Sequence, residues 1–241
     1  KSKAILLQLD INRCGRRLLL SPGQDKGLDV NGQQHRPADS AAEMRAFMPE
    51  SAPAAGMEIS LDLLGRPWRL TRPASLEELW EAMTPDDFGE DERLPYWAEL
   101  WPSSLVLADW LGRVRRDITG RACLDVGCGL GLTAALGAWL GAKVLAFDYE
   151  PDAARATLAN AARNGIFGVT ALTADWRKPA FKAGSISRAW AGDIMYERRF
   201  AHPVAAFLDH CLAPGGVVWL AEPCRPVSHE SLALLRGRGW T

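Results

Sequence analysis

The sequence lacks an apolar run long enough to cross a membrane. A spanning helix needs about 20 consecutive apolar residues, and no stretch of this chain reaches that length. The apolar block near the beginning, within residues 1–7, is also too short for a signal peptide. We therefore predict a cytoplasmic protein with no membrane partner.

The sequence also lacks a surplus of one charge. Its 28 Lys and Arg residues nearly balance its 29 Asp and Glu residues, which gives a formal net charge of -1 at pH 7. Proteins that bind nucleic acid usually carry a marked basic surplus. The composition therefore argues against a nucleic-acid partner.

Cysteine and histidine are scarce, with five and four residues in a chain of 241. The cysteines form no C-x-x-C pair, and the histidines have no metal-site spacing with them. We predict reduced cysteines and no metal site. Hydrophobic residues make up 48% of the chain, which is ample for a buried core.

What the chain does contain is a regular alternation of helix and strand patterns after residue 101. Strands are predicted over 122–126, 143–147, 169–172, 187–191 and 217–221, and helices over 102–111, 133–140, 151–164, 203–212 and 228–235. Such alternation predicts right-handed βαβ units. The expected fold is therefore α/β, a doubly wound and mostly parallel sheet with helices on both faces.

The chain divides into three predicted parts. Residues 1–57 show no clear period and are rich in Gly, Pro, Gln and Ser, which indicates a weakly ordered extension. Residues 58–112 are expected to form a hairpin and helices, one of which begins at a capping box of Ser75 and Glu78. Residues 113–241 form the core.

The most informative segment is an apolar strand that ends in an acid and runs into three alternate glycines. The acid is Asp125, and the glycines are Gly127, Gly129 and Gly131. Glycine lets the backbone turn tightly and lets a ligand approach the main chain closely. A second strand ends at Asp148, at the distance where a doubly wound sheet places an acid for a ribose diol. The pattern predicts a nucleotide cofactor.

The spacing of the glycines distinguishes between cofactors. Leu132 stands where the dinucleotide fingerprint G-x-G-x-x-G has its last glycine, so NAD is disfavoured. The order acid-x-Gly-x-Gly-x-Gly instead resembles the S-adenosylmethionine loop of the seven-strand (class I) methyltransferases. The resemblance implies that Asp125 lies near the methionine end of the cofactor and that Asp148 binds the ribose hydroxyls.

The same resemblance implies an adenine site after the third strand. Asp175 is expected to contact the adenine amino group and Trp176 the ring, although Trp176 is equally interpretable as a rim residue that covers the core. Tyr149, beside the ribose acid, completes the expected cofactor contacts on this side.

Two narrower motifs resemble the lysine-directed branch called methyltransferase family 16. Asp193 to Tyr196 reads D-x-x-Y, and residues 95–102 read PYWAELWP, similar to the segment P-[FY]-W-A-x-x-W-P of the electron-transfer flavoprotein β-subunit lysine methyltransferases and their bacterial relatives. The resemblance covers roughly residues 60–236.

This resemblance implies roles for four side chains. Trp97 and Trp101 contact the cofactor near its sulfonium, Asp193 positions the acceptor amine, and Tyr196 lines a channel for an aliphatic stem. Two plainer interpretations remain open: Asp193 caps the turn that begins at Ile194, and the aromatic segment only fastens a helix to the sheet.

The predicted function is thus an S-adenosylmethionine-dependent N-methyltransferase acting on a lysine side chain of a protein. A small-molecule N-methyltransferase of the same fold and a cofactor-binding protein without turnover are the alternatives. The family's last helix is followed by a further strand, whereas this sequence stops at Gly239-Trp240-Thr241, so we expect a truncated C terminus or a short sheet edge. The sequence predicts no oligomeric state.

Overall fold

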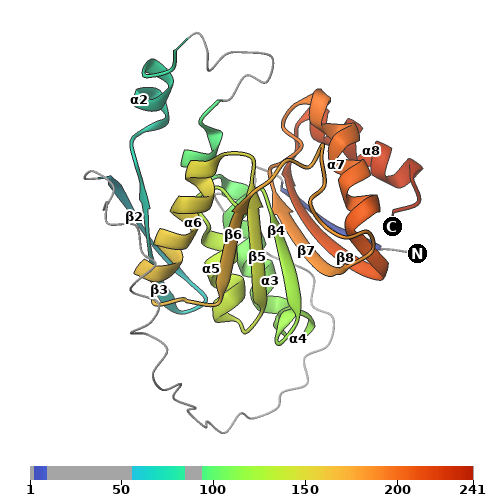
Figure 1. Cartoon of the computed structure of the whole chain (residues 1–241), viewed down its shortest axis with the longest axis horizontal. Helices are drawn as coiled ribbons and strands as arrows, with labels where there is room; N and C mark the ends of the chain where they lie inside the picture. The colour runs from blue at the N-terminus through green and yellow to red at the C-terminus, as the bar shows by residue number, and fades with distance from the viewer. Residues whose placement is uncertain (1–2, 10–55, 85–93, 241) are drawn as a thin grey trace, which may run out of the picture.

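A parallel sheet forms the centre of the molecule in the computed structural model, which describes residues 3–9, 56–84 and 94–240. Its strand order is β1-β8-β7-β4-β5-β6, and every neighbouring pair is parallel (Figure 1). The strands are β1 (Lys3–Leu9), β4 (Ala122–Val126), β5 (Lys143–Asp148), β6 (Val169–Thr173), β7 (Ile186–Gly192) and β8 (Leu212–Pro223). The predicted doubly wound α/β fold is confirmed.

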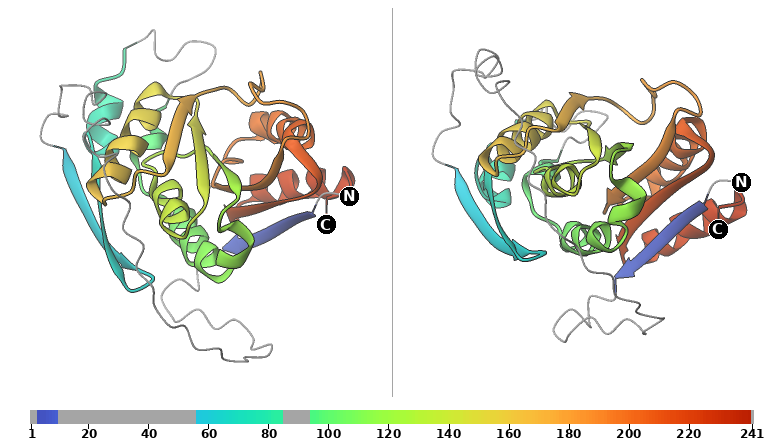
Figure 2. Two further views of the ribbon diagram at one scale, coloured as in Figure 1. Left: turned by 60° about the horizontal axis from the view of Figure 1, so that its bottom comes forward. Right: turned by 90° about the horizontal axis from the view of Figure 1, so that it is seen from below.

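Helices cover both faces of this sheet (Figure 2). They are α3 (Pro102–Arg113), α4 (Arg115–Ile118), α5 (Leu132–Trp139), α6 (Pro151–Arg163), α7 (Arg198–Cys211) and α8 (Pro226–Gly237). Because side chains alternate along a strand, Trp190 of β7 faces the cluster with α3 and α5, whereas Ala189 and Ala191 face α7 and α8. Within the described ranges, no helix is both long and apolar enough to cross a membrane.

Some boundaries differ from the sequence-based expectation. The structure begins α7 at Arg198, whereas the pattern predicts a start at Pro203, a residue type typical of a first helical turn. This predicted start is wrong, because buried Ala201 extends the apolar face of the helix toward its N-terminus. The short elements α4 and η4 (Tyr96–Ala98) are not predicted by the periodicity.

The strand β1 is an addition to the expected fold. It pairs in parallel with β8, in a register that runs from Lys3 opposite Val217 to Leu9 opposite Pro223. Therefore β8 is an interior strand rather than a short sheet edge. The rest of the predicted extension, residues 10–55, lies outside the described part of the chain.

The predicted hairpin and capped helix are both confirmed. Strands β2 (Met57–Leu63) and β3 (Arg66–Arg72) are antiparallel and meet at a two-residue turn. Trp68 and Leu70 of β3 are fully buried in the core cluster with α3 and α5. The helix α2 (Leu76–Glu81) carries the reciprocal hydrogen bonds of the Ser75–Glu78 capping box.

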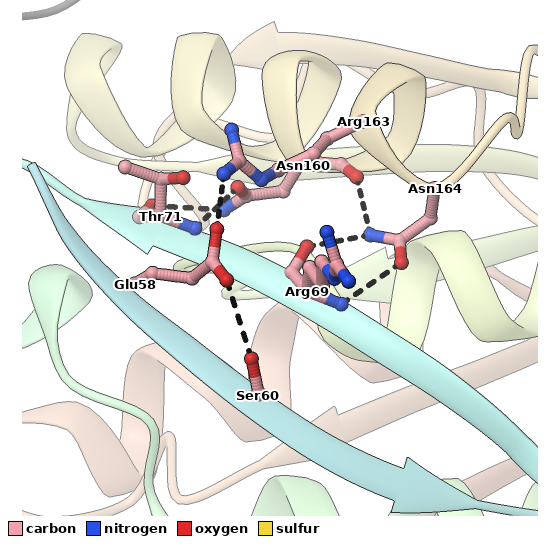
Figure 3. Close-up of polar contacts among 7 residues, drawn as sticks. All are labelled: Glu58, Ser60, Arg69, Thr71, Asn160, Arg163 and Asn164. Atoms are coloured by element: carbon pink, nitrogen blue, oxygen red, sulfur yellow. Dashed lines mark hydrogen bonds and ion pairs between the residues drawn. The ribbon is translucent and has the colours of Figure 1, made fainter.

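Asn160 of α6 and Asn164, which directly follows this helix, bind the strand β3 of the hairpin (Figure 3). Asn160 accepts from the Thr71 amide at 2.7 Å and donates to the Thr71 carbonyl at 3.1 Å. Asn164 makes the same pair of contacts with Arg69, at 3.0 and 2.7 Å. A side-chain amide has the donor and acceptor of a peptide group, so the two asparagines take the place of a third strand. Asn160 also donates to the Leu130 carbonyl at 2.9 Å, which links the hairpin to the glycine loop.

We predict that Asn160→Ala lowers the free energy of unfolding by about 2 to 4 kcal/mol, because the half-buried backbone groups of Thr71 and the buried carbonyl of Leu130 lose their partner. Urea titration measures the loss, and hydrogen exchange at the Thr71 amide should accelerate. Arg163→Ala is the matched control on the same helix, since its partner Glu58 is an exposed side chain. Equal losses in the two variants would show that surface charge, not the asparagines, holds the hairpin.

Candidate functional site

A cavity of about 280 Å³ opens where the strands β4, β5, β6 and β7 end. Ligands of open α/β sheets bind at this end, and their sites span ~300 to 1,000 Å³. The walls come from the glycine loop, from the turns after β5, β6 and β7, and from the segment that contains η4; the lining includes residues 127–132, 148–150, 175–177, 192–194 and 94–101 except Pro95 and Ala98. The cavity therefore lies where the sequence places a cofactor.

The glycine loop has the left-handed backbone that its sequence suggests. The φ angles of Gly127, Gly129 and Gly131 are 69, 51 and 81°. A Cβ atom on Gly131 would lie 2.6 Å from the Cα of Thr157, so this glycine is also required for α6 to pack against the loop. Thr157 then donates its hydroxyl to the Gly129 carbonyl at 3.1 Å.

Asp148 joins the end of β5 to this loop. Its Oδ2 accepts from the Gly129 amide at 2.9 Å, and its Oδ1 accepts from the Glu150 amide at 3.1 Å. Burial raises the pKa of this carboxyl above its ordinary value. Each carboxylate oxygen keeps a further lone pair. Because the residue lines the cavity, it can accept hydrogen bonds from the hydroxyl groups of a ligand.

Asp125 lies behind the loop rather than on the cavity wall. It is 1% exposed, its Oδ2 accepts from the Thr133 hydroxyl at 2.7 Å, and it is absent from the cavity lining. Burial raises its pKa to about 7. The resemblance implies a place near the methionine end of the cofactor, and this role of Asp125 stays a prediction.

A row of aromatic rings forms one wall of the cavity. The ring centroids of Trp101, Tyr96, Tyr196, Phe200 and Trp176 follow one another at 5.9, 5.4, 5.0 and 5.5 Å, each pair edge to face. Such contacts stabilise the arrangement beyond the area that they bury. Burial raises the pKa of Tyr196 above its ordinary value, so its hydroxyl is protonated at neutral pH.

The aromatic segment before α3 also touches the glycine loop. The Trp97 carbonyl lies 3.2 Å from the place of a Cβ on Gly129, and the Trp101 indole donates to the Tyr96 carbonyl at 2.9 Å. Both tryptophans line the cavity. The segment therefore contributes a wall of the cavity as well as a contact between elements.

Asp175, the acid that we expect to contact adenine, already has a partner within the protein. Asp175 accepts from the Arg177 side chain at 2.9 and 3.0 Å, and the Arg177 guanidinium lies 5.2 Å from the Tyr149 ring centroid. Asp175, Arg177, Tyr149 and Trp176 all line the cavity. An amino group of a ligand would have to share the Asp175 carboxylate with Arg177.

Asp193 does not cap the turn that follows it. The amides of Ile194 and Met195 donate to Oε1 of Glu222 at 3.0 and 3.3 Å, so the capping interpretation of Asp193 is wrong. Asp193 itself has a left-handed φ of 55°, is 9% exposed and forms an ion pair with Arg225. It lines the cavity with Tyr196.

The predicted site residues other than Asp125 all line the same cavity. Sequence reasoning missed four residues that shape the site: Tyr96, Phe200, Glu222 and Arg225. Tyr96 belongs to the aromatic motif of residues 95–102, so its place at the site was predictable from the sequence. Glu222 lies near the end of the last strand and Arg225 lies two residues beyond that strand, neither within a motif, and only the folded sheet brings them to the segment of Asp193.

The fold and the cavity define an α/β domain built to bind a nucleotide-type cofactor at the ends of its strands. The described residues contain no group of three or more His, Cys, Asp or Glu side chains placed to hold a metal ion. Residues 123–216 match the family model described as "Methyltransferase domain". This part of the chain is therefore a methyltransferase domain, and the resemblance to the class I methyltransferases is confirmed.

Curated relatives show which methyltransferases are similar. The "Electron transfer flavoprotein beta subunit lysine methyltransferase" of Rattus norvegicus is 31% identical over 134 residues, which cover 55% of this chain and 52% of the relative. The protein of the same name from Danio rerio is 32% identical over 54% and 51% of the two chains. The "Ribosomal protein L11 methyltransferase" of a Vibrio cholerae strain is 38% identical over 32% and 25%. The chain spans about half the length of the flavoprotein-directed relatives.

Solved structures show weaker overall similarity. A geranyl diphosphate C-methyltransferase from Streptomyces coelicolor A3(2) superposes with a TM-score of 0.42 at 16% identity, over 54% of this chain and 59% of the other. An S-adenosylmethionine-dependent methyltransferase from Mesorhizobium loti has a TM-score of 0.36 at 27% identity, over 46% and 52%.

Glu222 makes stability depend on pH. Burial raises its pKa from an ordinary 4.5 to about 7, so its neutral form stabilises the fold fully below pH 4.5 and this stability is lost as pH rises through 7. Glu222→Gln keeps the acceptor for Ile194 and Met195 without the charge. We predict that the wild type loses about 3 kcal/mol relative to the variant between pH 4.5 and 8.

Urea unfolding of both proteins across this pH range measures the difference. Asp125 and Asp148 are present in both proteins, so their contributions cancel. Parallel stability curves would contradict the assignment of a raised pKa to Glu222.

Proposed function

We propose that this chain is an S-adenosylmethionine-dependent methyltransferase that methylates the side-chain amine of a lysine in a cytoplasmic protein. The observation that carries the proposal is the shared cavity of Asp148, the glycine loop, Asp193 and Tyr196. It joins a nucleotide-binding acid to a carboxylate and a ring suited to an aliphatic amine. The names of the relatives, which include lysine methyltransferases of a flavoprotein subunit, support the same activity.

The residues present fit the cofactor. Asp148 lies on the cavity wall with lone pairs for two ribose hydroxyls, and Gly129 keeps side-chain atoms out of the adjoining space. Trp176, the residue that we assign to adenine, lines this cavity, and so do Trp97 and Trp101, which we assign to the methionine end. When bound, the cofactor supplies a methyl group already activated on a sulfonium.

The aromatic wall suits a lysine stem. The stem is apolar along its length, and its terminal nitrogen carries the charge. A lysine in water has a pKa of ~10.4 and must lose its proton before it attacks a methyl group. Removal from water between Tyr96, Tyr196 and Phe200 favours the neutral amine.

The protein then has mainly to orient the acceptor. Alignment of the amine lone pair with the methyl group can remove about 7 kcal/mol of the barrier in good cases. Asp193 is placed to orient the amine, and Tyr196, with its protonated hydroxyl, lines the approach. No strong general base is required by this chemistry.

Incubation of the purified protein with methyl-labelled S-adenosylmethionine and a cytosolic extract tests the proposal. Label is expected in protein, and amino-acid analysis after hydrolysis should find it in methyllysine. Label confined to small metabolites would instead support a small-molecule N-methyltransferase. Cofactor binding without transfer to any pool would support a protein without turnover.

We further predict that two acids have separable roles. Asp148→Ala should weaken the binding of S-adenosylmethionine at least about tenfold, because hydrogen bonds to a charged group are lost. Asp193→Ala should leave cofactor binding within about threefold of the wild type and lower turnover. Calorimetry gives the first quantity and initial rates the second. An equal loss of binding in both variants would show that this division of roles is wrong.

A further inference from the structure

Arg225 meets Asp193 at the ends of two neighbouring strands. Asp193 directly follows β7, Arg225 lies two residues after β8, and Gly192 and Ala221 are opposite each other in the register of the pair. The Arg225 guanidinium donates to Oδ1 of Asp193. The Asp193 side chain is only 5% exposed, so bulk water screens its charge little.

Residues of β8 hold the backbone around Asp193 through hydrogen bonds. Its amide donates to the Ala221 carbonyl at 2.8 Å, and Glu222 holds the next two amides. Among the residues that the structure describes, Oδ2 of Asp193 has no hydrogen-bond partner, and Arg225 alone pairs with this carboxylate. Asp193 lines the cavity whereas Arg225 does not, so Oδ2 is the oxygen left for a ligand.

A buried carboxylate without its own cation would hinder the proposed reaction. An opposite charge within ~4 to 6 Å favours the charged form of a titratable group by about one to three pKa units. Unpaired Asp193 would therefore hold an incoming lysine as the ammonium ion, which has no lone pair for attack. A cation already paired with Asp193 removes most of that effect.

We propose that Arg225 is a positioning residue for the methyl acceptor, which holds Oδ1 of Asp193 and leaves Oδ2 to accept a hydrogen bond from a neutral lysine amine. This inference rests on the proposed function. The amine nitrogen forms a bond to the methyl carbon as the bond from that carbon to sulfur breaks. The electron pair stays on sulfur, and the product ammonium releases its proton to water.

Other charged and titratable groups lie near this pair on several elements. Tyr96 of η4 interacts electrostatically with Arg225, and Glu222 near the end of β8 accepts from the amide of Ile194, the residue after Asp193. Tyr196 lines the cavity with Asp193, and Asp148 at the end of β5, Glu197 and Arg199 interact electrostatically with Tyr196. The variants below leave all of them in place. A change in pH dependence then reports on the charge at position 225.

A binding experiment tests the charge balance without turnover. n-Butylamine hydrochloride, a mimic of the lysine stem, is titrated at pH 7 into the protein saturated with S-adenosylhomocysteine. We predict that Arg225→Gln binds this ammonium roughly three to ten times more tightly than the wild type, because Asp193 is unpaired. Arg225→Lys, which keeps the positive charge, should bind it as the wild type does.

Kinetics of lysine methylation give the second measurement. In Arg225→Gln the midpoint of the profile of kcat against pH should move up by about one unit, so kcat near neutral pH falls about tenfold while KM does not rise. Arg225→Lys should restore the wild-type midpoint. Arg198→Gln is the matched control, since it removes an arginine from an exposed ion pair with Glu230 away from the cavity.

The outcomes separate this inference from the proposed function. Unchanged butylammonium affinity and an unchanged midpoint in Arg225→Gln would overturn the role of Arg225 while lysine methylation stands. A lysine variant as impaired as the glutamine variant would likewise show that charge at this position is not what matters. A wild-type protein that binds S-adenosylhomocysteine but never methylates lysine would overturn both.

Discussion

The hydrogen bond between the Gly129 amide and Asp148 is the contact on which the site depends. It ties the loop after β4 to the end of β5, and both of these segments line the cavity. Two side chains of α6 hold the same loop: Thr157 donates to the Gly129 carbonyl, and Asn160 donates to the Leu130 carbonyl. The loop is therefore held from the sheet and from the helix. Because Asn160 also holds β3, the hairpin belongs to the same support.

The cavity combines two kinds of surface that serve opposite needs. Around the loop, backbone groups and the Asp148 carboxylate offer hydrogen bonds to a polar cofactor. On the other side, a row of aromatic rings gives the cavity an apolar wall, and Asp193 lines the same cavity. For the lysine methylation that we propose, a cationic substrate that must react as a neutral amine would need both an apolar surface and a compensated carboxylate. In that proposal the ion pair of Asp193 with Arg225 would provide the second of these conditions.

Much of the fold is predictable from the sequence because its signals are local. Alternating strand and helix periods, the glycines after β4 and the Ser75–Glu78 box each act within a few residues, and the structure has the elements that they indicate. The pairing of β1 with β8 is different, since it joins residues more than two hundred positions apart. Likewise, the contacts of Glu222 with Ile194 and of Arg225 with Asp193 arise only when β7 and β8 lie side by side. For Asp125 the limit is different: the glycine motif identifies the residue, but it does not predict on which side of the loop the side chain lies.

The most direct test is a calorimetric titration of the wild-type protein with S-adenosylhomocysteine, with NAD as the comparison ligand. If the glycine loop and Asp148 hold an adenosyl methyl donor, the titration will show saturable binding to one site per chain, and NAD will produce no saturable heat. Absence of binding by folded protein, or a preference for NAD, would contradict the interpretation of this cavity.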